Sequence, residues 1–194
     1  VPLGAFLSGG IDSSITAGLA ARHTSHLHTF SIGFADNPYF DETQYAQIAA
    51  KKFGTEHTVF KLTNQQLFEH LNDVLQATSE PFADSSALPV YILSKETRRR
   101  VTVALSGDGA DELFGGYNKH MAAYRSRNRG FLEQMATLGH PLWKALPKSR
   151  NGRWTNRFRQ LERFAAGAKM SAAERWWRWC AFSGDDYPSQ LLRT

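Results

Sequence analysis

The sequence lacks the features of several protein classes. It has one cysteine, Cys180, among 194 residues, which excludes a disulfide framework and a cysteine-based zinc site. A single thiol is typical of a reducing compartment, so we expect a cytoplasmic location. No apolar run approaches the length of a membrane span, and no membrane partner is expected. The chain also lacks an initiator Met and starts on an expected core strand, so we expect it to be a piece of a longer protein.

The charge balance is moderately basic, and it does not by itself name a ligand. The formal net charge of +5 suits polyanionic ligands in general. Five arginines fall within residues 150–163, interleaved with Trp154 and Phe158, a pattern that RNA-binding segments share. An amphipathic helix with a solvated basic face explains the same pattern. We favour that helix and expect no nucleic-acid partner.

A glycine- and serine-rich turn, SGGIDSS at residues 8–14, follows an apolar stretch and opens an apolar-periodic segment. Unpaired N–H groups in the first turn of a helix attract anions, and the helix dipole adds to that attraction. Asp12 would repel an anion unless a cation lies between them, so the turn points to Mg²⁺ with a nucleotide polyphosphate. It is not a Walker A loop, because no G-x-x-x-x-G-K-[ST] motif occurs in the chain. The simpler alternative is a flexible turn with Asp12 as a helix N-cap.

Strand and helix patterns alternate along the first part of the chain, which indicates a parallel sheet built from β-α-β units. Strands are expected at residues 3–7, 27–34, 56–62 and 101–105, and helices at 13–23, from 41 to Gly54, from Asn64, and through Pro89 to Arg100. The apolar positions of the first two helices are Ile11, Ile15 and Leu19, then Tyr45, Ile48, Ala49 and Phe53. We predict an α/β fold with a doubly wound parallel sheet in residues 1–117 and an appended helical region in residues 118–194.

A second glycine-rich segment, LSGDGADELFGGY at residues 105–117, follows the last expected strand. It carries three acids, Asp108, Asp111 and Glu112, within five residues. Crowded carboxylates need a cation or a metal-bound anion beside them, although an acidic helix start would also account for the pattern. Ligands of parallel sheets bind beyond the carboxyl ends of the strands. The turns after Leu7 and Leu105 should therefore converge on one crevice.

These segments together resemble the C-terminal, ATP-using domain of glutamine-hydrolysing asparagine synthetases. The matching stretches are SGGIDSS (8–14), TFSIGF (29–34), FGTEH (53–57), SEPFADSSALPVYILSKE (79–96) and LSGDGADELFGGY (105–117). The resemblance implies the fold of the adenine nucleotide α-hydrolase-like (HUP-type) proteins and an ATP pyrophosphatase chemistry. It weakens after Tyr117.

The resemblance also implies a reaction, cofactors and roles for individual residues. The aspartate β-carboxylate would attack the α-phosphorus of ATP to give β-aspartyl-AMP and pyrophosphate, and ammonia would then displace AMP. The implied cofactors are ATP and Mg²⁺. The implied ATP- and pyrophosphate-binding residues are Leu7, Ser8, Gly9, Gly10, Asp12, Ser13, Ser14, Ile32, Ser106 and Gly107. The implied metal ligands are Asp12 and Asp111, the catalytic residues Asp108 and Asp111, and the acceptor-binding residues Asp84, Ser85 and Ser86.

The resemblance leaves some questions open. Many relatives carry glutamate where this chain has Asp108, which is shorter by about 1.5 Å, one C–C bond. The acceptor could therefore be another carboxylate, or the chain could be a nucleotide-binding module without catalysis. The implied partners are aspartate, ammonia and an N-terminal glutaminase domain, and a homodimer is also allowed. We expect this chain alone to be inactive or weakly active. For His57, a structural hydrogen bond is the favoured role over catalysis.

Overall fold

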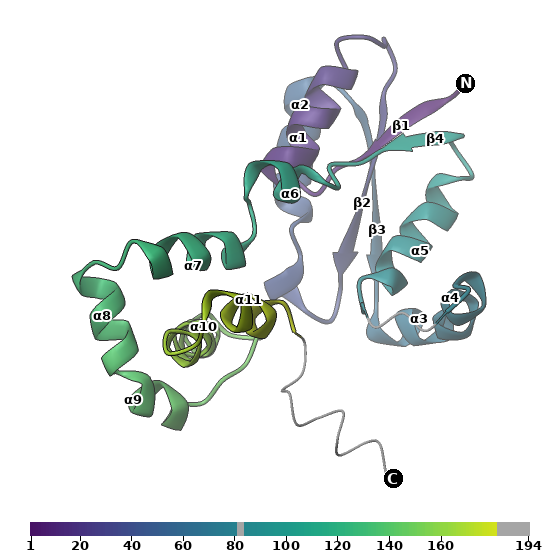
Figure 1. Cartoon of the computed structure of the whole chain (residues 1–194). Helices are drawn as coiled ribbons and strands as arrows, with labels where there is room; N and C mark the ends of the chain where they lie inside the picture. Colours follow the sequence, from purple (N-terminus) through teal and green to yellow (C-terminus); the bar gives the residue numbers. More distant parts are fainter. Residues whose placement is uncertain (81–83, 182–194) are drawn as a thin grey trace. The chain divides into compact units, whose positions relative to one another are not determined.

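The computed structural model describes residues 1–80 and 84–181 (Figure 1). These residues fall into two compact units, one within residues 1–110 and the other from Asp111 onward. The first unit contains a sheet, and its strands are β1 (Leu3–Phe6), β2 (His28–Phe34), β3 (Glu56–Leu62) and β4 (Val103–Leu105). All three strand pairings are parallel, in the order β3-β2-β1-β4. The predicted α/β class with a parallel sheet is confirmed. The boundary predicted after Tyr117 separates parts of different function and stays a prediction, because the division into compact units reflects packing alone.

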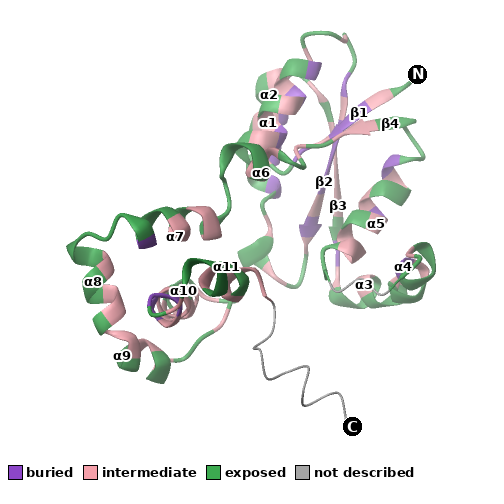
Figure 2. Cartoon of the chain, in the orientation of Figure 1, coloured by how far each residue is buried: buried purple, intermediate pink, exposed green. Residues whose placement is uncertain are grey.

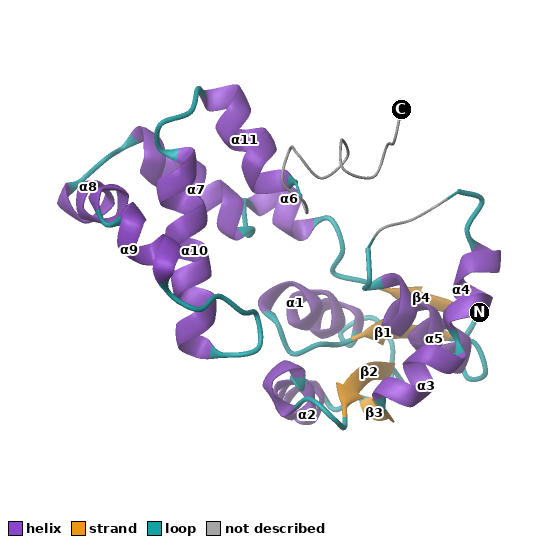
Figure 3. Ribbon diagram, turned by 90° about the horizontal axis from the view of Figure 1, so that it is seen from below, coloured by secondary structure: helices purple, strands orange, loops and turns teal. Residues whose placement is uncertain are grey.

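Helices cover both faces of this sheet, as a doubly wound fold requires (Figure 3). On one face lie α1 (Ile11–Ala20) and α2 (Thr43–Phe53), and on the other lie α3 (Asn64–Glu69), α4 (Leu71–Ala77) and α5 (Ala87–Thr97). A short 3-10 turn, Pro38–Phe40, connects β2 to α2. The chain runs outward from β1 to β3 and then returns to place β4 on the other side of β1. The chain reverses its direction of travel across the sheet between the neighbouring strands β1 and β4. Their carboxyl ends therefore form the topological switch point, where ligands of such sheets bind.

The core between the sheet and α1 and α2 is built from small residues. Its buried members are Ala5, Leu7, Ala17, Ala20, Leu27, Ala46 and Ala50. The larger residues that periodicity singled out on α1 face outward: Ile11, Ile15 and Leu19 are 78%, 56% and 53% exposed (Figure 2). On α2, Tyr45 and Ile48 are also exposed. Close packing of helix backbone on sheet explains this outcome, because alanine and not isoleucine fits the short distance.

Several element boundaries differ from the prediction for local reasons. The helix expected to start with Asn64 as its cap is capped by Thr63, which forms a reciprocal capping box with Gln66. That helix then breaks at His70 into α3 and α4. The strand expected at 101–105 is confined to β4, because Thr102 and Val103 both donate their N–H groups to the Pro2 carbonyl. Gly54 ends α2 in the left-handed conformation, as predicted.

Within residues 111–181 the second unit contains helices and no strand. After α6 (Ala110–Phe114), which crosses the boundary, come α7 (Asn118–Arg127), α8 (Phe131–Leu138), α9 (His140–Ala145), α10 (Arg153–Gly167) and α11 (Ala172–Cys180). No helix in the described part of the chain is long and apolar enough to cross a bilayer.

Arginines of the second unit satisfy the carbonyls at helix ends. Arg163 donates to the carbonyl oxygens of Arg178, Trp179 and Ala181 at the end of α11. Arg175 donates to the carbonyl oxygens of Gly167 and Met170, where α10 ends, and to Ser126 Oγ. The expectation of a solvated basic face on α10 does not hold for Arg163, because this side chain supplies donors to unpaired carbonyls at a helix end.

Candidate functional site

The turn between β1 and α1 contains Gly9 and Gly10, so its backbone is not covered by side chains at these two positions. Gly9 has a positive φ of 83°, and a Cβ there would run into the backbone of Tyr45 and Ala46 on α2. Gly10 is the N-cap of α1, and no side chain caps the helix. The alternative in which Asp12 is the N-cap is wrong, since Asp12 lies in the first turn. An uncapped first turn leaves its N–H groups available to an anion.

The serines of this turn have different roles, since Ser13 bonds within the loop and Ser14 faces an open hollow. Ser13 is buried, and its Oγ accepts from the Ser8 N–H at 3.2 Å and lies 2.9 Å from Ser8 Oγ. The Ser13 hydroxyl also donates to the Gly10 carbonyl at 3.3 Å. Ser14 lines a separate, open hollow of about 580 Å³ along α1 and α2, together with Ile15 and Leu19. Ser13 thus holds the loop in shape.

The turn after β4 packs against the turn after β1. A Cβ on Gly107 would lie 2.9 Å from the Ser13 nitrogen and 3.2 Å from Asp12 Cβ. Only glycine allows this approach, because real Cβ atoms do not come so close to backbone. In the same turn the Asp108 N–H donates to Ser106 Oγ at 3.1 Å, and the Asp108 side chain is exposed. The predicted convergence of the two turns is confirmed, at the switch point between β1 and β4.

A hollow of about 240 Å³ lies at the carboxyl ends of β1 and β2. Among the residues predicted to hold ATP, it is lined by Leu7, Ser8 and Ile32. Ser106 and Gly107 are not part of its lining. Sequence reasoning missed the other walls, which are Phe6, Phe30, Ser31, Phe34, Phe40, Glu42, Thr43, Pro89, Val90 and Leu93. The lining residues from α5 lie within residues 79–96, one of the stretches that resemble the family. That resemblance was the signal that could have pointed to them.

The residues predicted to bind the acceptor form the turn that precedes α5. Asp84 Oδ1 accepts from the Ser86 N–H at 2.9 Å, and the Asp84 carbonyl accepts from Ala87. The Ser86 backbone N–H, followed by its side chain, holds the pKa of Asp84 below its ordinary value. Asp84 and Ser85 are exposed, as is Ser86. The carboxylate therefore stays charged at neutral pH while it shapes this turn.

The remaining predicted acid, Asp111, opens the second unit beside Glu112. A Cβ on Gly116 would meet Asp111 Oδ1, so Gly116 makes room for this carboxylate. The Tyr117 hydroxyl donates to Glu112 Oε1 at 2.7 Å, and this hydrogen bond is the main cause that lowers the pKa of Glu112. Among residues 1–80 and 84–181, no three His, Cys, Asp or Glu side chains form a cluster that could hold a metal. Asp12 and Asp111 belong to different units, so their pairing on one ion stays a prediction.

An open parallel sheet with glycine-rich turns at its switch point defines a class, the α/β proteins that bind ligands beyond their strand ends. A sequence model of the family described as asparagine synthase matches residues 1–192, and the chain belongs to that family. The predicted HUP-like fold agrees with this membership.

Similar curated proteins carry related names. One is a putative glutamine-hydrolysing asparagine synthetase 2 of Methanocaldococcus jannaschii, 46% identical over 127 residues, which are 64% of this chain and 24% of that protein. Another is asparagine synthetase [glutamine-hydrolyzing] 1 of Bacillus subtilis, 43% identical over 61% of this chain and 18% of that protein. A third, from Arabidopsis thaliana, is 32% identical over 60% of this chain and 22% of that protein. The matched part therefore spans about a quarter or less of each relative.

Proposed function

We propose that this chain is the nucleotide-binding part of an ATP-dependent carbon–nitrogen ligase that makes asparagine. The observation that carries the proposal is the contact of Gly107 with Asp12 and Ser13, which brings both glycine-rich turns to the switch point of the sheet. Family membership and the names of the relatives support the choice of reaction.

In the proposed reaction, a β-carboxylate oxygen of aspartate forms a bond to the α-phosphorus of ATP while the bond to pyrophosphate breaks. Ammonia then forms a C–N bond at the acyl carbon, AMP leaves, and a proton is lost from nitrogen. Both steps bring polar or anionic groups together, so the protein contributes mainly positioning and charge neutralisation. We assign the pyrophosphate to the uncapped first turn of α1 and the turn that Ser8, Gly9 and Gly10 form.

The nucleoside part is assigned to the hollow beside Leu7 and Ile32. Ser106 and Gly107 do not line this hollow, and their assignment to the nucleoside depends on the family resemblance alone. Asp108 is assigned to the reacting centre, where it would take the proton released from the attacking amine. Asp84, Ser85 and Ser86 are assigned to the acceptor, because their turn begins the helix whose Pro89, Val90 and Leu93 line the same hollow.

Asp12 and Asp111 are assigned to Mg²⁺. Mg²⁺ prefers oxygen ligands and binds through one or two carboxylates plus substrate phosphates, so two carboxylates suffice for this ion. When bound with ATP, the ion supplies neutralisation of the phosphate charge. The other assigned partners, a glutaminase domain that releases ammonia and a second subunit, depend on the family alone. The proposed cytoplasmic location depends on the single cysteine.

The test is a carboxylate-dependent ATP–pyrophosphate exchange assay on the protein encoded by the complete reading frame, with aspartate among a panel of carboxylic acids. We expect aspartate to stimulate exchange and ammonia to yield asparagine. Asp12→Asn should lower exchange by at least 100-fold, and Asp73→Asn on α4, the same change outside the site, should not. Stimulation by another acid would reassign the acceptor, as the shorter Asp108 allows. Full exchange by Asp12→Asn would contradict the assignment of Asp12 to Mg²⁺. ATP binding by the unchanged protein without exchange in the presence of any acid would favour a binding module over an enzyme.

A further inference from the structure

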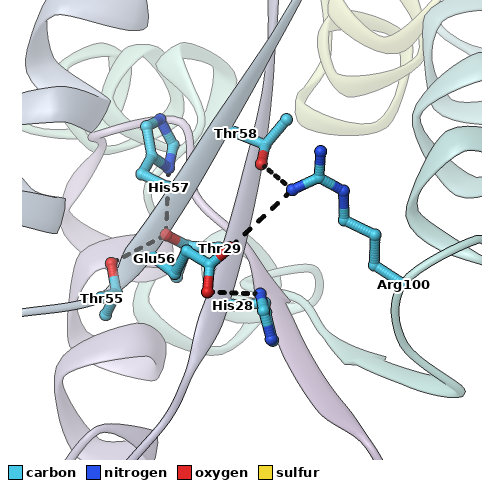
Figure 4. A network of polar contacts seen from close by, with 7 residues as sticks. All are labelled: His28, Thr29, Thr55, Glu56, His57, Thr58 and Arg100. Atoms are coloured by element: carbon cyan, nitrogen blue, oxygen red, sulfur yellow. Dashed lines mark hydrogen bonds and ion pairs between the residues drawn. The ribbon is translucent and has the colours of Figure 1, made fainter.

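One polar cluster lies next to the nucleoside hollow and has no part in the assignments above. It is centred on His57 of β3, which reaches across to two hydroxyls of β2. His57 Nδ1 lies 3.0 Å from Thr29 Oγ1, and Nε2 lies 3.1 Å from Ser31 Oγ. Thr29 Oγ1 lies 2.8 Å from Thr55 Oγ1 as well (Figure 4). Thr29 and Ser31 are both buried, so the cluster is part of the interior.

The two ring nitrogens couple these hydroxyls. A neutral imidazole has one N–H donor and one acceptor nitrogen, so the hydroxyl at one nitrogen must accept and the hydroxyl at the other must donate. Burial lowers the pKa of His57, which favours this neutral form. The orientation of the Ser31 O–H is therefore determined by the tautomer of His57, and through the ring by Thr29 and Thr55.

Ser31 has a position that makes this orientation matter. It is both a partner of His57 and a lining residue of the hollow, beside Leu7 and Ile32. A hydroxyl that rotates freely loses conformational entropy when a ligand fixes it. A hydroxyl that is already held in one orientation avoids this loss and binds the ligand more tightly. Within residues 1–80 and 84–181, His57 is the one hydrogen-bond partner of Ser31 Oγ.

We propose that His57 is a positioning residue for the nucleoside side of the site, which holds the Ser31 hydroxyl in one orientation in the wall of the hollow. This inference rests on the proposed function, since it assigns the hollow to the nucleoside of ATP. His57 touches no substrate in this scheme. It acts through Ser31, and its effect should appear in nucleoside binding and not in pyrophosphate binding.

The same pair of strands supplies a matched control. Residues adjacent along a strand point to opposite faces, so Glu56 lies on the face opposite His57. There Glu56 lies 3.5 Å from His28 and 4.0 Å from Arg100, and Arg100 donates to Thr58 Oγ1 at 2.8 Å (Figure 4). These contacts also link β2, β3 and the end of α5, but none of these four residues lines the hollow. A purely structural effect of cross-strand contacts would affect both faces.

The experiment is an NMR titration, which detects weak binding, of the protein encoded by the complete reading frame. The separate probes are adenosine, ATP with Mg²⁺ and inorganic pyrophosphate with Mg²⁺. We compare the unchanged protein with His57→Phe, Ser31→Ala, the double variant and Glu56→Gln. Loss of one oriented hydrogen bond should weaken adenosine and ATP binding about five-fold in either single variant. The double variant should be no worse than the single ones, because both remove the same interaction. Pyrophosphate binding should stay unchanged throughout, as should all binding by Glu56→Gln.

Other results would contradict the inference in distinguishable ways. Equal adenosine affinity in all variants, or additive losses in the double variant, would overturn the role of His57 and leave the proposed function intact. Equal losses for pyrophosphate and adenosine would mean that His57 supports the fold in general, which also overturns it. No ATP binding by the unchanged protein would overturn the proposed function, and this inference with it. Because His57→Phe could disturb the strands, His57→Gln, which keeps one donor and one acceptor, should restore binding at least in part.

Discussion

The two units of this chain differ in charge and in the groups that pair with their backbone N–H and C=O groups. In residues 1–110, Lys and Arg number 8 against 11 Asp and Glu, while in residues 111–194 they number 15 against 7. The first unit pairs its backbone in a sheet and leaves a helix start uncapped at Gly10. The second unit has no sheet among its described residues, and arginines donate to its helix ends.

The basic charge of the second unit is therefore not by itself evidence for a site that binds a polyanion. The five arginines within residues 150–163 suggested either RNA or a solvated helix face. Arg163 of this group donates to backbone carbonyls, as does Arg175 further along the chain. Glycines and serines, which carry no net charge, form the turns assigned to a polyanion. In the proposed function, the anion would therefore be held by available N–H groups and not by positive side chains.

The largest expected effect tests the close packing of the first unit. Gly9→Ala should destabilise the protein by about 3 kcal/mol, because a Cβ at positive φ would also overlap the backbone of α2. Gly109→Ala is the control: it has a similar φ of 88° but open space around it, and should cost about 1 kcal/mol. Urea unfolding followed by circular dichroism measures both. Equal losses would show that the contact with α2 carries no weight.

A smaller effect tests the arginines of the second unit. Arg175→Ala removes three hydrogen bonds, two of them to carbonyls near the end of α10, and should destabilise the protein by about 2 kcal/mol. Arg157→Ala, on the exposed side of α10 over the Trp154 ring, should cost about 0.5 kcal/mol. The measurement is the shift in thermal midpoint of each variant. A larger loss for Arg157 would contradict the structural role given to Arg175.

The capping boxes should make the two units alike. Thr63 caps α3 in the first unit and Ser171 caps α11 in the second. In each case the side chain at N3 accepts a hydrogen bond from the backbone N–H of the cap residue. Thr63→Ala and Ser171→Ala should each cost about 1 kcal/mol, since a cap is a local interaction. Differential scanning calorimetry compares them. A clear inequality would mean that the units differ in helix stability and not only in charge.

The smallest expected effect is a pH dependence in the first unit. Burial lowers the pKa of His57 from its ordinary value of 6.5, so the unfolded chain binds its proton more tightly than the folded chain. The resulting stability is fully present above pH 6.5 and is lost as the pH falls through the lowered pKa. The difference in unfolding free energy between the unchanged protein and His57→Gln, measured from pH 8 to pH 5, should therefore shrink toward low pH. A constant difference would rule out this titration.

Much of the fold followed from local patterns. The four strands, the left-handed Gly54 and the convergence of two turns were predictable, because alternation of strand and helix together with parallel pairing leaves few arrangements. The buried faces of α1 and α2 were not. Hydrophobic periodicity favoured Ile15, Leu19 and Ile48, whereas the sheet contacts Ala17, Ala20, Ala46 and Ala50. Residue size at a close contact depends on the partner surface, which periodicity does not contain.

The site divides in the same way. By itself, the sequence indicated the family and singled out the residues to which we assign the chemistry: the glycine-rich turns, Asp12, and the acids at 108, 111 and 112. Tertiary structure decided which of those groups are neighbours, because Gly107 meets Asp12 only after the chain crosses back to β4. It also decided that Ser13 supports the loop from inside and that Ser31 and α5 help form the hollow. Motifs record residue types along one chain, whereas distances between strand ends depend on how the whole sheet packs.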